Sequence, residues 1–248
     1  MLKVDRVVRK YGDFTAVDNV SFEIQPGEVV GFLGPNGSGK TTLMRVITAY
    51  MLPTKGTVYV DGLDVIRNPL EVSSRIGYLP ESNILYPQMR SGEFLLFVGR
   101  ARGLSGKRLK ERFDWCVDAM KIAPVLRKRN MECSKGFKQR ISLASALIHD
   151  PGYVILDEPT LGLDPLQIFM VRDFLKLISK EKVVLFSSHI LQEVAAMAKR
   201  VIIINEGHII GDARFEDREN RTERLEKIFT DAVLSARESG GKREEVRQ

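Results

Sequence analysis

The sequence contains little cysteine and no long hydrophobic run. Cys116 and Cys133 are its only cysteines, which is too few for a disulfide framework, and their spacing fits no metal-ligand motif. A reducing compartment is therefore expected. The first twelve residues, MLKVDRVVRKYG, lack the apolar core of a signal peptide, and apolar runs such as VIII at 201–204 are far shorter than a membrane span. We expect a soluble chain that would need a partner protein to act at a membrane.

Positive charge is concentrated in one segment. The chain has 248 residues, 44% of them hydrophobic, which allows one large domain or a core with an inserted subdomain. The net charge is +6, but residues 100–140 hold 13 Lys or Arg against 4 Asp or Glu. This segment is either the solvated face of a helical region or a surface that meets something acidic, such as lipid headgroups, a membrane partner or nucleic acid.

The order of apolar patterns indicates an α/β protein. Short β-rich runs with turn residues between them fill the first sixty residues: LKVDRVV, VSFEI, EVVGFL and TVYV. From about 91 to 150 the pattern is helical. Apolar runs return at 153–156, 183–186 and 201–204, and a helix with Ile168, Val171, Leu175 and Ile178 on one face separates the first two. Strand, helix and strand in this order predict a parallel sheet.

The C-terminal region differs from the rest. The segment NEGHIIGDA predicts a turn at Glu206 and Gly207 that returns a short edge strand. Beyond residue 212 the chain is dense in mixed charge. One amphipathic helix is expected there, with an apolar face of Leu225, Ile228, Phe229, Ala232 and Val233.

The segment GFLGPNGSGKTTL predicts a phosphate-binding loop. An apolar run precedes it at 28–33 and a helical pattern follows from Thr41 to Ala49, which is the context such a loop requires. Glycines let backbone N–H groups point at phosphate oxygens, Lys40 would reach the β and γ phosphates, and Thr41 would hold Mg²⁺. The predicted nucleotide-binding residues here are Gly34, Pro35, Asn36, Gly37, Ser38, Gly39, Lys40, Thr41 and Thr42.

Two further strand ends carry candidate catalytic residues. Asp157 ends the run YVILD and would support the metal ion, whereas Glu158 points differently and would polarise an attacking water. A pair of acids at a strand end is usually only solvated, but after a phosphate loop it is the expected partner. His189 follows the strand run VVLF and would contact the γ-phosphate, because strand ends at one edge of a parallel sheet converge. A lone histidine in such a place is more often structural.

The segment MECSKGFKQR, residues 131–140, combines small residues and donors ahead of a helix. Ser134 and Gly136 lie among basic residues, and an apolar helix face follows at Ile141, Ala144, Leu147 and Ile148. Nothing within this stretch shows what its donors would bind.

Five segments in sequence order, GPNGSGKTT, SKGFKQR, VILDEP, LGLD and SSH, resemble the ATP-binding subunits of ABC transporters. The resemblance covers about residues 2–211. It implies an α/β fold: a P-loop NTPase core with a mostly parallel sheet, an N-terminal antiparallel β subdomain and an inserted α-helical subdomain at about 82–150. The ABC ATPase domain would then span 1–211, with a charged extension at 212–248.

The resemblance also implies a nucleotide site shared between two subunits, with ATP and Mg²⁺ as cofactors. In this family the loop before the Asp-Glu strand end is the signature motif, so Ser134 and Gly136 would bind the γ-phosphate of ATP held by the other subunit. Tyr11 would stack on adenine with Val17 nearby, although a core or edge aromatic is an open alternative for Tyr11. Asp164 in LGLD would cross the dimer interface.

Two positions depart from the commonest family pattern. The signature is most often Leu-Ser-Gly-Gly-Gln, whereas Cys133, Lys135 and Phe137 stand at its first, third and fifth positions here. Glu81 stands where Gln is commonest, in the loop that senses Mg²⁺ and contacts the permease, and it offers a charged ligand for the metal. Both variants are similar to those of subunits that drive separate export permeases, including drug-resistance, polysaccharide and gliding-motility types.

We therefore expect an ATP-hydrolysing subunit that dimerises on ATP and drives export through a separate membrane permease, at the cytoplasmic face of the inner membrane. The alternative is a soluble ABC-type ATPase that acts on nucleic acid or ribosomes. DNA-repair members carry long coiled coils between the two nucleotide motifs and ribosome-acting members carry two cassettes, whereas this chain has about 117 residues between Lys40 and Asp157 and one cassette. Nucleic acid is thus not the expected partner. A GTPase lacks support because no Asn-Lys-x-Asp motif occurs.

Overall fold

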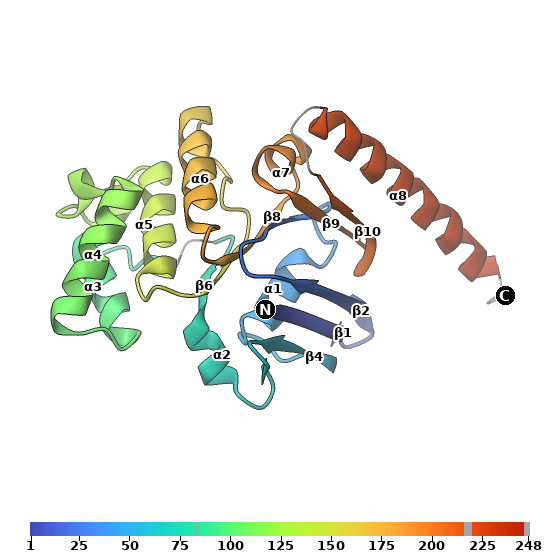
Figure 1. Ribbon diagram of the computed structural model, residues 1–248, viewed down its shortest axis with the longest axis horizontal. Coiled ribbons are helices and arrows are strands. Elements are labelled where there is room, and N and C mark those ends of the chain that lie inside the picture. Colours follow the sequence, from blue (N-terminus) through green and yellow to red (C-terminus); the bar gives the residue numbers. More distant parts are fainter. Residues whose placement is uncertain (83, 216–219, 246–248) are drawn as a thin grey trace.

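The structure, a computed structural model, describes residues 1–82, 84–215 and 220–245, with side chains described up to residue 235. Its first sheet is antiparallel (Figure 1), and a two-residue turn at Gly12 and Asp13 joins its first two strands. Gly12 has φ of +57°, a conformation that glycine adopts at little cost. In the order β2-β1-β4-β5, the strands are β1 (Leu2–Tyr11), β2 (Phe14–Ile24), β4 (Lys55–Val60) and β5 (Leu63–Asp64).

The second sheet has six strands in the order β10-β9-β3-β8-β7-β6. All neighbouring pairs are parallel except β10 with β9, which confirms the predicted mostly parallel sheet with an antiparallel edge strand. The strand at the other edge, β6, was not predicted, because its four residues IGYL include a glycine and do not form a continuous apolar run. The strands are β3 (Val29–Leu33), β6 (Ile76–Leu79), β7 (Tyr153–Leu156), β8 (Val183–Ser188), β9 (Arg200–Asn205) and β10 (His208–Arg214).

Both faces of the parallel sheet are buried. In β3, Val29 and Leu33 belong to one hydrophobic core, and Val30 and Phe32 belong to the other. The strands β7, β8 and β9 alternate in the same way, which explains why they are continuous apolar runs in the sequence. Each buried aliphatic side chain contributes about 1.5–3 kcal/mol to folding, so these strands fix the frame that carries the candidate site.

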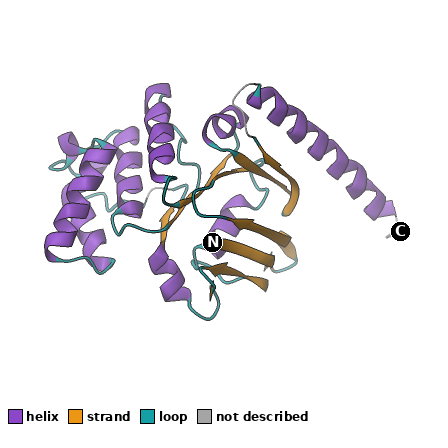
Figure 2. Ribbon diagram, viewed as in Figure 1, coloured by secondary structure: helices purple, strands orange, loops and turns teal. Residues whose placement is uncertain are grey.

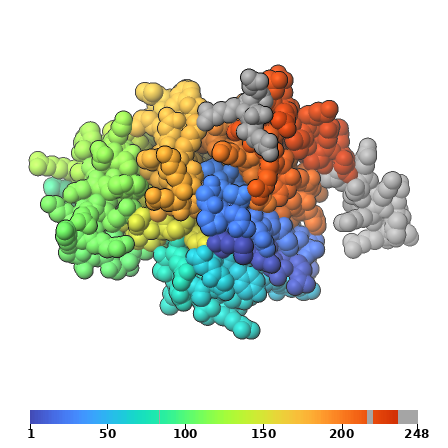
Figure 3. Space-filling model, in the orientation of Figure 1, coloured from blue at the N-terminus to red at the C-terminus, as the bar shows by residue number. Residues whose placement is uncertain are grey.

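Helices cover the two faces unequally (Figure 2). Leu43, Met44 and Ile47 of α1 pack in the same core as the antiparallel sheet, whereas α5, α6 and α7 contribute to the other core. Residues of α3 and α4 form a lobe at the left of the molecule (Figure 3). The helices before the last are α1 (Lys40–Ile47), α2 (Pro69–Arg75), α3 (Ser91–Ala101), α4 (Gly106–Met120), α5 (Lys135–Leu147), α6 (Pro165–Ile178) and α7 (Leu191–Met197), with short 3₁₀ helices at Ala123–Val125 and Asn130–Glu132.

The predicted C-terminal helix is present as α8 (Arg221–Glu245), which projects away from the lobe of α3 and α4 (Figure 1). Leu225 is fully buried, and Ile228 and Phe229 pack partly against the main core. The strand β10 continues to Arg214, three residues past the expected domain boundary at 211, so those residues belong to the sheet. The division of the chain into two domains stays a prediction. No helix in the described part of the chain is both long and apolar enough to cross a membrane.

Candidate nucleotide-binding site

The predicted phosphate loop connects the buried strand β3 with α1. Its glycines are required by close packing as well as by their backbone freedom. A Cβ atom at Gly34 would lie 2.3 Å from the carbonyl oxygen of Ile204, and one at Gly39 would lie 2.4 Å from that of Ala16. Gly39 also has φ of +105°, which side chains rarely allow. The loop is therefore held tightly against β2 and β9, with Lys40 as the first residue of α1.

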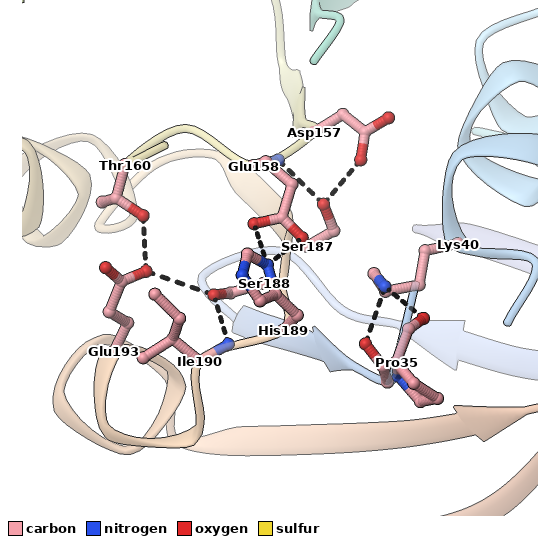
Figure 4. Close-up of polar contacts among 11 residues, drawn as sticks. Pro35, Lys40, Asp157, Glu158, Thr160, Ser187, Ser188, His189, Ile190 and Glu193 are labelled. Atoms are coloured by element: carbon pink, nitrogen blue, oxygen red, sulfur yellow. Dashed lines mark hydrogen bonds and ion pairs between the residues drawn. The ribbon is translucent and has the colours of Figure 1, made fainter. Parts of the chain in front are cut away.

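Lys40 is buried and folds back over the loop. Its Nζ donates hydrogen bonds to the carbonyl oxygens of Gly34 (2.7 Å) and Pro35 (2.9 Å) (Figure 4). Burial lowers the pKa of Lys40 below its ordinary value, and the carboxylates of Glu158 and Asp157 oppose that shift. The amine thus lies between the phosphate loop and the carboxylates at the end of β7, where its positive charge would attract a bound anion.

Asp157 and Glu158 follow β7 and share one serine. Ser187 Oγ donates to Asp157 Oδ1 at 2.6 Å and accepts from the backbone N–H of Glu158 at 2.8 Å (Figure 4). Asp157 is fully buried, and its Oδ2 has no hydrogen-bond partner in the described part of the chain. A buried carboxylate oxygen without a partner is costly, which is typical of a position where a cation binds.

Glu158 and His189 form a pair across two strand ends. His189 Nδ1 lies 3.1 Å from both carboxylate oxygens of Glu158. Glu158 is 94% buried, and its φ of +49° is unusual for a residue with a side chain. Strained backbone of this kind is found where a side chain must be aimed in a fixed direction. The structure therefore brings together the two residues predicted for water activation and γ-phosphate contact.

A cavity of about 630 Å³ joins these groups. Ten of its lining residues were predicted. Six belong to the phosphate loop and the start of α1, and the others are Glu158 and His189 at the strand ends, Tyr11 of β1 and Glu81 of the loop after β6. Phe14, Ala16 and Leu161 line it as well, although no sequence pattern marks them. The lining residues are Tyr11, Phe14, Ala16, Asn36, Gly37, Gly39, Lys40, Thr41, Thr42, Glu81, Glu158, Leu161 and His189.

The predicted adenine contacts differ in position. Tyr11 lies at the cavity and is 43% exposed. The guanidinium carbon of Arg9 lies 4.9 Å from the centroid of its ring. Val17 is fully buried in the core, and its neighbour Ala16 reaches the cavity instead. The reason is irregular pairing of β2 with β1, which buries two successive residues rather than alternate ones. Gly34, Pro35 and Ser38 belong to the loop but do not line the cavity.

The residues predicted to bind a second nucleotide lie elsewhere. Ser134, Gly136 and Asp164 are not among the lining residues of the cavity. Ser134 is exposed at the N-terminus of α5, where its Oγ accepts from the N–H of Phe137, and Asp164 begins α6 by accepting from Gln167. The N-termini of α5 and α6 are in contact, since a Cβ at Gly136 would lie 2.2 Å from Gln167 Oε1.

The residues predicted to hold Mg²⁺ lie at or beside the same cavity. Thr41 and Glu81 line the cavity, and Asp157 is buried beside it with its free carboxylate oxygen. No cluster of three His, Cys, Asp or Glu side chains able to hold a metal occurs among the described residues. A divalent cation would therefore need phosphate oxygens as further ligands, and the residues present fit that arrangement.

The basic segment is partly structural. Arg112 donates to the carbonyl oxygens of Leu147 and Ile148 at the end of α5, and Arg140 donates to those of Met120 and Lys121. These two guanidinium groups therefore satisfy backbone carbonyl groups at the C-termini of α5 and α4. The remaining excess charge is compatible with either interpretation of the segment.

A family model for ABC transporters matches residues 17–161, which is more than half of the chain. The chain belongs to the ABC transporter ATP-binding family. This confirms the resemblance seen in the five sequence motifs, and the match includes the phosphate loop, the signature loop and Glu158.

Relatives of this ABC protein include several that are named for export or resistance. ABC transporter ATP-binding protein NatA of Bacillus subtilis is 40% identical over 223 residues, which cover 88% of the chain and 91% of NatA. Nod factor export ATP-binding protein I of Paraburkholderia xenovorans is 34% identical, with 85% and 70% covered. Daunorubicin resistance ATP-binding protein DrrA3 of Streptomyces coeruleorubidus is 32% identical, with 93% and 74% covered.

Solved structures of ABC cassettes share the fold of this ABC protein. The ATP-binding subunit of an ABC transporter superimposes with a TM-score of 0.83 at 26% identity, covering 94% of this chain and 99% of the other. A dimeric bacterial ABC transporter cassette gives 0.79 at 26% identity, covering 88% and 100%. Together with the two sheets and the inserted helices, these likenesses confirm the predicted P-loop NTPase fold.

Proposed function

We propose that this ABC protein binds ATP with Mg²⁺, hydrolyses the ATP, and drives export through a separate membrane permease. The observation that carries the hydrolysis is the convergence of the phosphate loop, Glu158 and His189 on one cavity. Likeness to relatives named for Nod factor export and daunorubicin resistance supports the direction of transport. Peripheral attachment at the cytoplasmic face of the inner membrane follows from the proposed permease.

The residues would share the chemistry as follows. The N–H groups of the phosphate loop and Lys40 hold the phosphates, and Glu158 accepts the proton of the attacking water as general base. His189 keeps Glu158 in place through its 3.1 Å contact and faces the same cavity. Thr41, Glu81 and Asp157 would hold Mg²⁺, which supplies positive charge beside the phosphates.

Two copies of the chain would share each nucleotide. Ser134 is exposed at the start of α5 and outside the cavity of its own chain, so its hydroxyl can meet the nucleotide of a second copy. Gly136 is buried against Gln167, whose side chain would have to turn away before Gly136 could take part. Asp164 caps α6, the helix whose Gln167 lies against Gly136, and would enter the same interface. The dimeric cassette among the solved structures supports this arrangement.

The permease contact would lie on a second cavity. It measures about 360 Å³ and shares Glu81 with the nucleotide cavity, so a segment bound there would touch the loop that also faces the nucleotide. Tyr50 and Ile84 line it and are largely exposed, which suits an apolar contact with a protruding segment of a membrane protein.

Ile84→Asp should therefore separate permease binding from ATP hydrolysis. Ile84 is 66% exposed and does not line the nucleotide cavity, so the variant should fold and hydrolyse ATP within about twofold of wild type. A charge buried in an apolar contact should lower the amount of integral membrane protein that co-purifies with the tagged chain at least about tenfold.

Leu70→Asp is the matched control for this experiment, because Leu70 is 86% exposed and lines neither cavity. Equal co-purification with Ile84→Asp and with wild type would contradict the proposed docking cavity. If wild type captures no integral membrane protein, the permease part of the proposal fails while ATP hydrolysis stands on its own measurement.

A further inference from the structure

Three side chains link the loops after β7 and β8 without touching the nucleotide cavity. Glu193 Oε2 accepts a hydrogen bond from Thr160 Oγ1 at 2.5 Å and one from Ser188 Oγ at 3.1 Å (Figure 4). Thr160 and Glu193 are 33 residues apart in the sequence. None of the three residues lines the cavity, so a direct contact with nucleotide does not explain them.

The link joins two buried hydroxyl groups through the half-buried Glu193. Thr160 is 97% buried and Ser188 is fully buried, so their hydroxyl groups need a partner within the fold. Glu193 lies in the first turn of α7, where the helix dipole favours a negative charge. No ion pair joins Glu193 to a basic side chain in the described part of the chain, which leaves its carboxylate to the two hydroxyls.

Each hydroxyl holds one of the two loops that carry the proposed catalytic pair. Ser188 precedes His189, and its Oγ accepts from the N–H of Ile190 at 3.0 Å, so the serine braces the backbone on both sides of the histidine. Thr160 is two residues beyond Glu158 in the tight turn where the N–H of Leu161 donates to the carbonyl oxygen of Glu158. Displacement of either loop would change the 3.1 Å contact between His189 and Glu158.

We infer that Glu193 is a positioning residue for hydrolysis: it joins the loops of Glu158 and His189 and keeps that pair aligned on the cavity. The inference rests on the proposed ATP hydrolysis and adds a residue to it. Its effect passes through His189 and Glu158, since no hydrogen bond drawn in Figure 4 joins Glu193 to either of them.

Steady-state ATP hydrolysis by Glu193→Ala and Glu193→Gln tests the inference. Glu193→Ala should lower kcat by about 10- to 100-fold and leave KM within about threefold, because misplacement of the catalytic pair slows the reaction more than it weakens binding. Glu193→Gln should stay within about threefold of wild type, since its amide oxygen still accepts both hydroxyls. Gln192→Ala, one residue earlier and exposed, is the matched control and should match wild type.

A combination with His189→Ala separates positioning from a general structural role. If Glu193 acts through the pair, Glu193→Ala should lower kcat less than about threefold further in the His189→Ala background. If kcat of the double variant falls by the product of the two single losses, the inference is overturned. A wild-type kcat for Glu193→Ala, or a loss of kcat in Glu193→Gln equal to that in Glu193→Ala, would also overturn it.

Thr160→Val covers the case in which Glu193→Ala has a melting temperature well below that of wild type. This change removes one hydroxyl at nearly constant volume. The kcat of Thr160→Val should fall at least about threefold, with KM unchanged. A kcat equal to wild type for Thr160→Val would then overturn the inference. Wild type that binds ATP without hydrolysing it would overturn the proposed function and this inference together, whereas an active wild type matched by Glu193→Ala overturns the inference alone.

Discussion

Glu158→Gln should lower kcat for ATP hydrolysis by at least about 100-fold while ATP affinity stays close to that of wild type. The amide keeps the shape of the side chain but cannot accept the proton of the attacking water. It can still accept a hydrogen bond from His189, and the backbone contact with Ser187 Oγ at 2.8 Å is unaffected. The expected loss is therefore confined to the chemical step, which single-turnover hydrolysis and equilibrium binding of ATP measure separately.

Glu181→Gln provides the control for this variant. Glu181 is exposed and lies just before the amino end of β8, whereas Glu158 lies beyond the carboxyl end of β7. The same chemical change there should leave both measurements at wild-type values. Equal losses of binding and hydrolysis in Glu158→Gln would instead identify Glu158 as a metal ligand, and unaltered hydrolysis would remove it from the mechanism.

The second large effect is expected for Lys40→Ala, which should weaken ATP binding itself by about 10- to 100-fold, the range of a hydrogen bond between charged groups. Lys40 is the cation of the phosphate loop, and it is buried where water screens little. Burial lowers its pKa, and the carboxylates of Glu158 and Asp157 oppose that shift. Titration of the chain with ATP would measure the change in Kd.

Lys180→Ala controls for the loss of a lysine, because Lys180 is exposed beyond the end of α6. The melting temperature of Lys40→Ala should be recorded as well, since its hydrogen bonds to Gly34 and Pro35 also hold the loop. ATP affinity that is unchanged in a folded Lys40→Ala protein would place the nucleotide somewhere other than this cavity.

Local patterns were sufficient for much of the fold and for the phosphate loop. The strands β7, β8 and β9 are apolar runs because both faces of their sheet are buried, so they could be predicted without knowledge of their neighbours. The phosphate loop could be predicted because its chemistry lies within eight consecutive residues, from Gly34 to Thr41.

Features that depend on contacts between distant segments were missed. Ala16 rather than Val17 faces the cavity because the pairing of β1 and β2 is irregular, and residue patterns do not show where a bulge falls. The SSH motif does not predict the role of Ser187, which forms hydrogen bonds with both Asp157 and Glu158 from another strand. No sequence pattern marks Glu193, because the hydroxyl of Thr160 is brought to it only by the fold.

The central claim is that each nucleotide lies between the phosphate loop of one copy and the signature loop of another. It can be tested with two damaged chains, Lys40→Ala and Ser134→Arg, each carrying Glu158→Gln to prevent turnover. Lys40→Ala weakens the phosphate loop, and Ser134→Arg fills the exposed donor site at the start of α5. In a dimer of identical copies both shared sites are damaged, whereas in a mixed dimer both lesions fall in one site and the other is intact.

The most direct measurement is the molecular mass in solution with and without ATP. The account predicts that Glu158→Gln alone dimerises on ATP, that each damaged chain by itself stays monomeric, and that an equimolar mixture of the two regains an ATP-dependent dimer. If the signature loop served the nucleotide of its own chain, every site in the mixture would remain damaged. A mixture that stays monomeric, while Glu158→Gln alone dimerises under the same conditions, would contradict the shared site.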